Sequence, residues 1–132
     1  MYQDIRAALV THYQGLGLAL PVQWENTQSI NDEQFIKFDF IPNVNAAATL
    51  GTNGADRHQG LLQLLIKKPI EAGPGDSLTL ASTIVEHFKR GSVVSYNGVS
   101  VKIKNATAGG AYPSADKYIT PITITWQSDI QR

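Results

Sequence analysis

The chain contains no cysteine and no excess of charge of either sign. The absence of Cys excludes disulfides, thiolate catalysis and thiolate metal sites. Eleven basic side chains balance eleven acidic ones, so no net field attracts nucleic acid or an anionic membrane. No apolar run approaches a length of about 20 residues, which a membrane helix needs. The N-terminal segment has an acid at Asp4 and lacks the apolar core of a signal peptide. These absences predict a cytoplasmic protein without a membrane anchor.

The composition is that of a globular protein, with 42% hydrophobic and 17% charged residues. A length of 132 residues predicts one domain, residues 1–132, with an ordinary core. The charges are unevenly divided, because residues 1–66 carry three basic and six acidic side chains, a net of −3, and the rest carry +3. Opposite charges on the two halves favour head-to-tail association of subunits.

Two segments have helical periodicity. The first helix is expected over Tyr2–Leu16, with an apolar stripe at three- and four-residue spacing. The second is expected to be capped by Asp76 or Ser77 and to end at Gly91. Its predicted buried stripe is Leu78, Ala81, Ile84, Val85 and Phe88.

The strand pattern begins with a short candidate at Val22–Glu25 and continues with Phe35–Ile41, where apolar and charged residues alternate. Pro42 is expected to end the second strand. Gly60–Lys68 has apolar residues on both faces, which predicts a central strand covered from both sides. A weaker strand is expected within Asn43–Leu50.

The strongest local signal is the dipeptide Asn97-Gly98 within Val93–Ile103, the sequence of a two-residue type I′ hairpin. Tyr118–Gln127 closes the chain as a strand, and Pro121 predicts that this strand lies at an edge. The sequence therefore predicts an α+β fold, a mostly antiparallel sheet of five or six strands with two helices packed on one face. The predicted core comprises Phe38, Phe40, Leu64, Ile66, Ile84, Phe88 and Trp126.

The three histidines are the first candidates for chemistry. His12 falls in an apolar helical stripe and is expected to be packed, with a bonded ring nitrogen. His87 is expected to be solvated beside Glu86. His58 belongs to the triplet 56–58, which is predicted to be a solvated surface patch because a metal site needs several converging ligands.

No pattern of a catalytic or cofactor site is present. Gly73–Asp76 precedes a helix, but no Gly-Lys-Ser/Thr follows and Asp76 carries a negative charge where phosphate would bind. No Gly-x-Ser-x-Gly sequence occurs. We therefore predict no catalytic residue, no metal and no cofactor, and interpret the chain as a non-enzyme.

Basic pairs are more promising as contacts with other proteins than as a nucleic-acid site, which normally has a larger positive excess. The segments Asn43–His58 and Ala106–Lys117 are predicted to be long loops, which often carry function. The alternative is that both loops are idle. The candidate interface residues are Arg57, His58, Lys67, Lys68, Lys102, Lys104 and Lys117.

Several stretches together resemble the tail terminator proteins of long-tailed bacteriophages. The resemblance is densest from Arg57 to Gly91 and spans nearly the whole chain. The residues that carry it are Asp4-Ile5-Arg6, a short strand around Trp24, Arg57, Gly60-Leu61-Leu62-Gln63, Pro69, the turn at Gly75 and a helix that ends in Phe88 and Gly91.

The resemblance implies a structural protein that forms a ring, typically of six subunits. Such a ring docks on the tail-tube protein, stops its polymerisation and contacts the head–tail connector, while DNA passes through without sequence-specific binding. It implies a location in the tail or neck of the virion, assembly in the host cytoplasm and no membrane partner. Two alternatives remain: another neck or head-completion ring protein, and a small α+β enzyme or ligand-binding domain.

Overall fold

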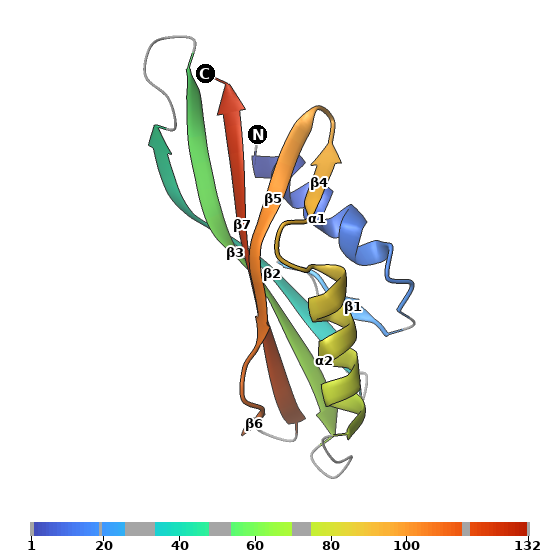
Figure 1. The fold of residues 1–132 in the computed structure, drawn as a ribbon. Coiled ribbons are helices and arrows are strands. Elements are labelled where there is room, and N and C mark those ends of the chain that lie inside the picture. The colour runs from blue at the N-terminus through green and yellow to red at the C-terminus, as the bar shows by residue number, and fades with distance from the viewer. Residues whose placement is uncertain are drawn as a thin grey trace.

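Two helices and a strongly curled, mostly antiparallel sheet form the described parts of the chain (Figure 1). A computed structural model describes residues 2–18, 20–25, 34–47, 54–69, 75–114 and 117–131. The α+β prediction is confirmed. The elements, in chain order, are α1 (Tyr2–Gln14), β1 (Val22–Gln23), β2 (Phe35–Ala47), β3 (Ala55–Pro69), α2 (Gly75–His87), β4 (Val93–Tyr96), β5 (Val99–Ala108), β6 (Tyr112–Ser114) and β7 (Lys117–Gln131).

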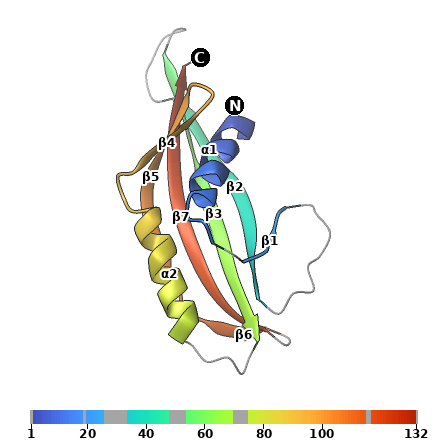
Figure 2. The ribbon, with the colours of Figure 1, turned by 90° about the vertical axis from the view of Figure 1, so that its right-hand side faces the viewer.

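The sheet has the strand order β1-β2-β3-β7-β5-β4, and β6 also pairs with β7. Among the described strands, only β1 and β2 pair in parallel. The two longest strands, β3 and β7, run side by side through the sheet and are visible along its length in both views (Figures 1 and 2). The described sheet therefore has seven strands, one more than the upper expected number, because β6 forms inside a predicted loop.

The edge position predicted for the last strand is wrong, because β7 lies between β3 and β5. The structure explains how Pro121 is tolerated there. Its carbonyl accepts a 2.8 Å hydrogen bond from the backbone N–H of Gly109. Because the N–H and C=O of one strand residue point to the same side, the missing N–H of Pro121 also falls on the side of Gly109. Pairing with β5 ends at Ile122 and pairing with β6 begins at Ile119. Pro121 thus lies opposite the interruption between two partner strands.

The long loops predicted at Asn43–His58 and Ala106–Lys117 are shorter than expected, because strands extend into both ranges. Strand β2 continues through Pro42 to Ala47, with a register shift between Pro42 and Val44. Proline is tolerated here because bulges and edge strands need no N–H from it. The weaker strand predicted at Asn43–Leu50 is the end of β2, and its last residues lie outside the described parts. At the other predicted loop, β5 extends to Ala108.

The predicted hairpin is confirmed. Tyr96 pairs with Val99, and Asn97 and Gly98 have φ angles of +50° and +82°, as a type I′ turn requires. Val101 and its cross-strand partner Val94 are buried, and α1 packs on both strands of the hairpin.

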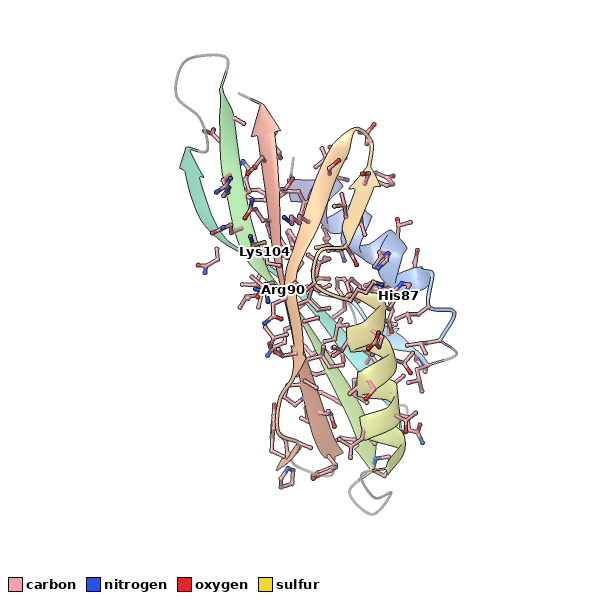
Figure 3. All side chains as sticks on the ribbon, in the orientation of Figure 1. His87, Arg90 and Lys104 are labelled. Atoms are coloured by element: carbon pink, nitrogen blue, oxygen red, sulfur yellow. The ribbon has the colours of Figure 1, made fainter. Side chains whose placement is uncertain are left out.

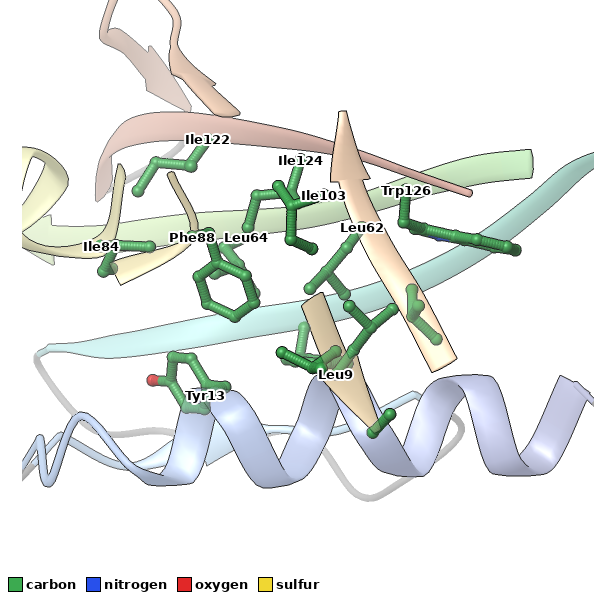
Figure 4. Close-up of a cluster of buried hydrophobic side chains, with 14 of the residues drawn as sticks. Leu9, Tyr13, Leu62, Leu64, Ile84, Phe88, Ile103, Ile122, Ile124 and Trp126 are labelled. Atoms are coloured by element: carbon green, nitrogen blue, oxygen red, sulfur yellow. The ribbon is translucent and has the colours of Figure 1, made fainter. Parts of the chain in front are cut away.

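One hydrophobic cluster contains buried residues of both helices and alternate residues of β2, β3 and β7 (Figure 4). Six of the seven predicted core residues are at most 1% exposed, and only Phe40 is partly exposed. Helix α1 packs on β4 and β5, whereas α2 packs on β3, β5 and β7. Because the curled sheet offers these helices different strands, packing of both on a single face stays a prediction.

Two predicted burial patterns need correction. In α2, Leu78 is 58% exposed while Ser77 is buried within the first turn, so Ser77 does not cap the helix and the buried stripe is rotated. In β3, buried and partly exposed residues alternate, so only one face of this strand is fully covered. The apolar residues Leu61 and Leu65 are on the partly exposed side.

Candidate interaction surfaces

The described residues contain no group of three or more His, Cys, Asp or Glu side chains that could hold a metal. No helix in the described ranges is long and apolar enough to cross a membrane. The structure therefore directs attention to surfaces that could contact other proteins, and first to the basic residues predicted from the sequence.

Two of the predicted contact residues are buried, which corrects the interpretation of 56–58 as a solvated patch. His58 is 3% exposed and Lys68 is 6% exposed. The ring of Tyr2 lies edge-on to His58 with centroids 5.5 Å apart, which brings the start of α1 over this part of β3. The alternation of β3 explains the result, because His58 and Lys68 fall on its covered face.

Arg57 lies on the opposite side of β3 and is paired with an acid in its own chain. Its Nε donates to Oδ1 of Asp129 at 3.0 Å, across the β3–β7 register. Both side chains are about 40% exposed (43% and 40%). This ion pair already neutralises Arg57, so an approaching partner finds a charge pair there and not a free cation.

Lys67 and Lys117 come together although they are 50 residues apart in the chain. Their ammonium groups lie 5.5 Å and 5.9 Å from the centre of the Phe35 ring. Phe35 is only 5% exposed, and both ammonium groups lie within cation–π distance of its ring.

Lys102 and Lys104 meet Arg90 around a cleft of about 170 Å³, which Gly91 and Ile103 also line. Figure 3 shows Arg90 and Lys104 next to each other, on the turn after α2 and on β5 respectively. A register shift between Ile103 and Asn105 marks a β-bulge at Lys104, and bulges redirect side chains. Sequence analysis identified the lysines, but the contribution of Arg90 depends on the fold.

His12 and His87 form a stacked pair that joins the ends of the two helices. Their ring centroids are 4.0 Å apart and the rings are inclined by 16°. Nε2 of His12 donates to the backbone carbonyl of His87 at 2.7 Å, and Nε2 of His87 donates to the carbonyl of His12 at 2.6 Å. Since a carbonyl only accepts, both rings carry a proton on Nε2.

This pair confirms the bonded ring nitrogen predicted for His12 and corrects the solvated position predicted for His87. The two carbonyls belong to the last turns of α1 and α2, where backbone acceptors lack regular α-helical partners. The His12 carbonyl also accepts a longer bond, at 3.2 Å, from the N–H of Gly15. Each imidazole therefore satisfies an acceptor of the other helix. No spacing rule could have found the pair, because the residues are 75 positions apart.

We expect the stability of the fold to decrease as the pH falls below about 6.5, the ordinary pKa of histidine. Burial and the neighbouring His87 ring hold the pKa of His12 below its ordinary value, although the hydrogen bond to the His87 carbonyl raises it. The unfolded chain therefore binds the proton at a higher pH than the folded chain, and protonation favours unfolding. Urea midpoints at pH values of about 7.5 and 5.5 measure the effect.

The control is His12→Phe, which keeps an aromatic ring in the stack and cannot bind a proton. We expect the wild type to lose more stability than this variant between the two pH values. Equal losses in both proteins would show that His12 does not contribute to the pH dependence.

The model of a family described as phage tail terminator protein matches residues 4–126. No curated protein sequence matches the chain, whereas eight solved chains do. One of these aligns with 97% of this chain and 95% of its own length, at a TM-score of 0.78 and 18% sequence identity, which shows a shared fold.

Proposed function

This chain belongs to the phage tail terminator family, a family of structural proteins of the virion tail, and we propose that it forms a ring of six subunits on the end of the tail tube. The ring stops polymerisation of the tube and joins the tail to the head connector. DNA passes through it without sequence-specific binding. The protein assembles in the host cytoplasm and is located at the neck of the virion.

The match to the family over nearly the whole chain carries this proposal. The distribution of charge supports the ring, because a net of −3 on residues 1–66 and +3 on the rest suits a head-to-tail contact between identical subunits. Exposed charge pairs are screened by salt, so rings held in this way form best at high protein concentration or on the tube. A monomer in dilute solution agrees with this model.

The surface residues that we propose for these contacts are the predicted basic residues that the fold leaves accessible. Lys67 with Lys117 forms one group and Lys102 with Lys104 forms another, whereas Arg57 contributes as an ion pair. His58 and Lys68 are excluded from direct contact by their burial. The protein acts here as a single domain whose contacts are with other proteins, with no cofactor.

We expect the protein to shorten tail tubes when it is added to polymerising tube subunits. A cap on the growing end prevents further addition, so the mean tube length should fall as the protein concentration rises. Negative-stain electron microscopy measures tube length and shows whether density sits on the ends. In the control, an unrelated protein of similar size is added in its place, which shows whether the tube subunits polymerise to their usual length.

Tubes that keep growing at a saturating concentration, with bare ends, would eliminate the terminator assignment. Binding to the portal complex in place of the tube would indicate a head-completion ring, the nearer alternative. A small enzyme or ligand-binding domain is disfavoured because the family is structural.

A further inference from the structure

The outer edge of β5 is open beyond the point where β4 ends. Strand β4 pairs only with Val99–Lys102. The next residue, Ile103, accepts a hydrogen bond from Gly91 N–H at 2.9 Å and donates one to the Ser92 carbonyl at 2.8 Å. From Lys104 to Ala108, the described parts of the chain supply a strand on the β7 side only. An edge with unpaired backbone groups is a template for another strand.

On the opposite side of the sheet, β2 is covered from Ile36 to Pro42 in a different way. The N–H of Ile36 donates to the Pro21 carbonyl at 3.0 Å, and the N–H of Phe40 donates to the Glu25 carboxylate at 3.2 Å. Pro42 has no N–H to offer. A bidentate ion pair with Arg6, at 2.7 Å and 3.1 Å, holds Glu25 in place. The fold thus covers β2 from Ile36 to Pro42 against strand addition and leaves β5 from Lys104 to Ala108 accessible.

Helix α2 runs beside the open part of β5 and forms a groove with it. The groove has a volume of about 290 Å³ and is lined by Leu78, Ala81, Ser82, Val85, Glu86 and Ala108. Leu78 is 58% exposed although it is on the helix side that faces this groove. A strand added to β5 would direct every second side chain toward α2, and this lining is suited to small apolar side chains.

The basic cleft formed by Arg90, Lys102 and Lys104 lies at the end of the same stretch of β5. In Figure 3, Arg90 and Lys104 lie just beyond the end of α2 that His87 marks. The groove beside α2 contains one acid, Glu86, which disfavours a carboxylate there. The surface therefore has two parts, an apolar groove beside α2 and a cationic end at Arg90, Lys102 and Lys104.

We propose that this surface binds an extended segment of a partner protein by strand addition to β5, with alternate apolar side chains in the groove and a carboxylate at the cationic end. Backbone hydrogen bonds provide the affinity in such complexes, and the side-chain pockets provide the specificity. The proposal goes beyond the ring, because a protomer that never closes a ring still carries the groove.

A synthetic peptide with the sequence Asp-Thr-Val-Thr-Val-Thr-Asp tests the proposal, since it places a carboxylate at the cationic end in either strand direction. We expect it to shift the amide resonances of Lys104–Ala108 in two-dimensional NMR spectra of the full chain. A version with lysine in place of both aspartates tests the charge requirement. A version with proline in place of the threonines tests strand addition, because proline cannot donate to the ladder. Both are expected to bind more weakly.

Protein variants localise the binding. Lys104→Glu and Leu78→Ala are each expected to weaken binding of the first peptide by at least about threefold, the size of a modest exposed contact. The matched control is Lys89→Glu, which makes the same charge change at an exposed residue outside both clefts and should leave the affinity within about twofold. The folded state of each variant is checked by its spectrum.

Three results would overturn the proposal. Equal binding of the aspartate and lysine peptides would show that charge complementarity does not contribute to binding. Resonance shifts confined to β2 would place strand addition at the other edge. A self-association of the protein that Leu78→Ala and Lys104→Glu abolish, without any binding of the peptide, would identify a second copy of the chain as the occupant.

Discussion

Replacing Phe88 by Ala is expected to lower the free energy of unfolding by about 3–5 kcal/mol, the usual cost of deleting a core aromatic ring. Phe88 is 0% exposed, and Figure 4 shows it pointing into the cluster beside Leu64 and Ile84. Its ring also meets the His12 ring edge-on, with centroids 4.8 Å apart. The variant therefore leaves a cavity and removes support from the histidine pair. Urea denaturation at neutral pH measures the loss.

The matched control for Phe88→Ala is Leu78→Ala, which truncates a large apolar side chain on α2, the helix that Phe88 directly follows. Because Leu78 is 58% exposed, we expect this change to alter stability by less than about 0.5 kcal/mol. A loss below about 1 kcal/mol for Phe88→Ala would mean that the ring is not part of the core. The same Leu78 variant separates stability from binding, because it is expected to lower the affinity for the peptide and to leave the free energy of unfolding nearly unchanged.

The features that sequence predicted best depend on residues that are close together in the chain. The turn at Asn97 and Gly98 needs positive φ at both positions, and few residue types supply it. In β2, the alternation of apolar and charged residues likewise predicts the covered face from neighbouring residues alone. These rules need no knowledge of what the segment packs against, and this explains why the hairpin and most of the core were predicted correctly.

The features that sequence missed depend on segments that are distant in the chain. The partner of His12 is 75 residues away, and the exposure of Leu78 follows from where α2 sits beside an open strand edge. Pro121 predicts an edge strand by itself, but it is tolerated inside the sheet because the chain between β5 and β6 passes opposite it. The basic cleft is similar, because Arg90 joins the lysines only through the turn after α2.

We expect Gly60→Ala to destabilise the fold by about 1–3 kcal/mol, in the range of overpacked cores, although only one methyl group is added. A Cβ at position 60 would lie 2.6 Å from Cζ2 of Trp126 and 2.9 Å from Cα of Pro42, and it would also meet the Ile41 carbonyl. The Trp126 ring is 0% exposed and stacks on Phe40 with centroids 5.3 Å apart, so it has no free space to move into.

The β2 backbone is equally unable to retreat, because Pro42 is the cross-strand partner of Gly60. The matched control is Gly110→Ala, where an added Cβ meets no atom within 4 Å and stability should change by less than about 0.5 kcal/mol. Urea midpoints compare the two variants, and near-ultraviolet circular dichroism reports displacement of the Trp126 ring. Equal stability of Gly60→Ala and Gly110→Ala would show that the close approach of β2, β3 and Trp126 is not maintained in solution. A loss of stability in Gly60→Ala but not in Gly110→Ala would show that the packing at position 60 leaves no room for a Cβ atom.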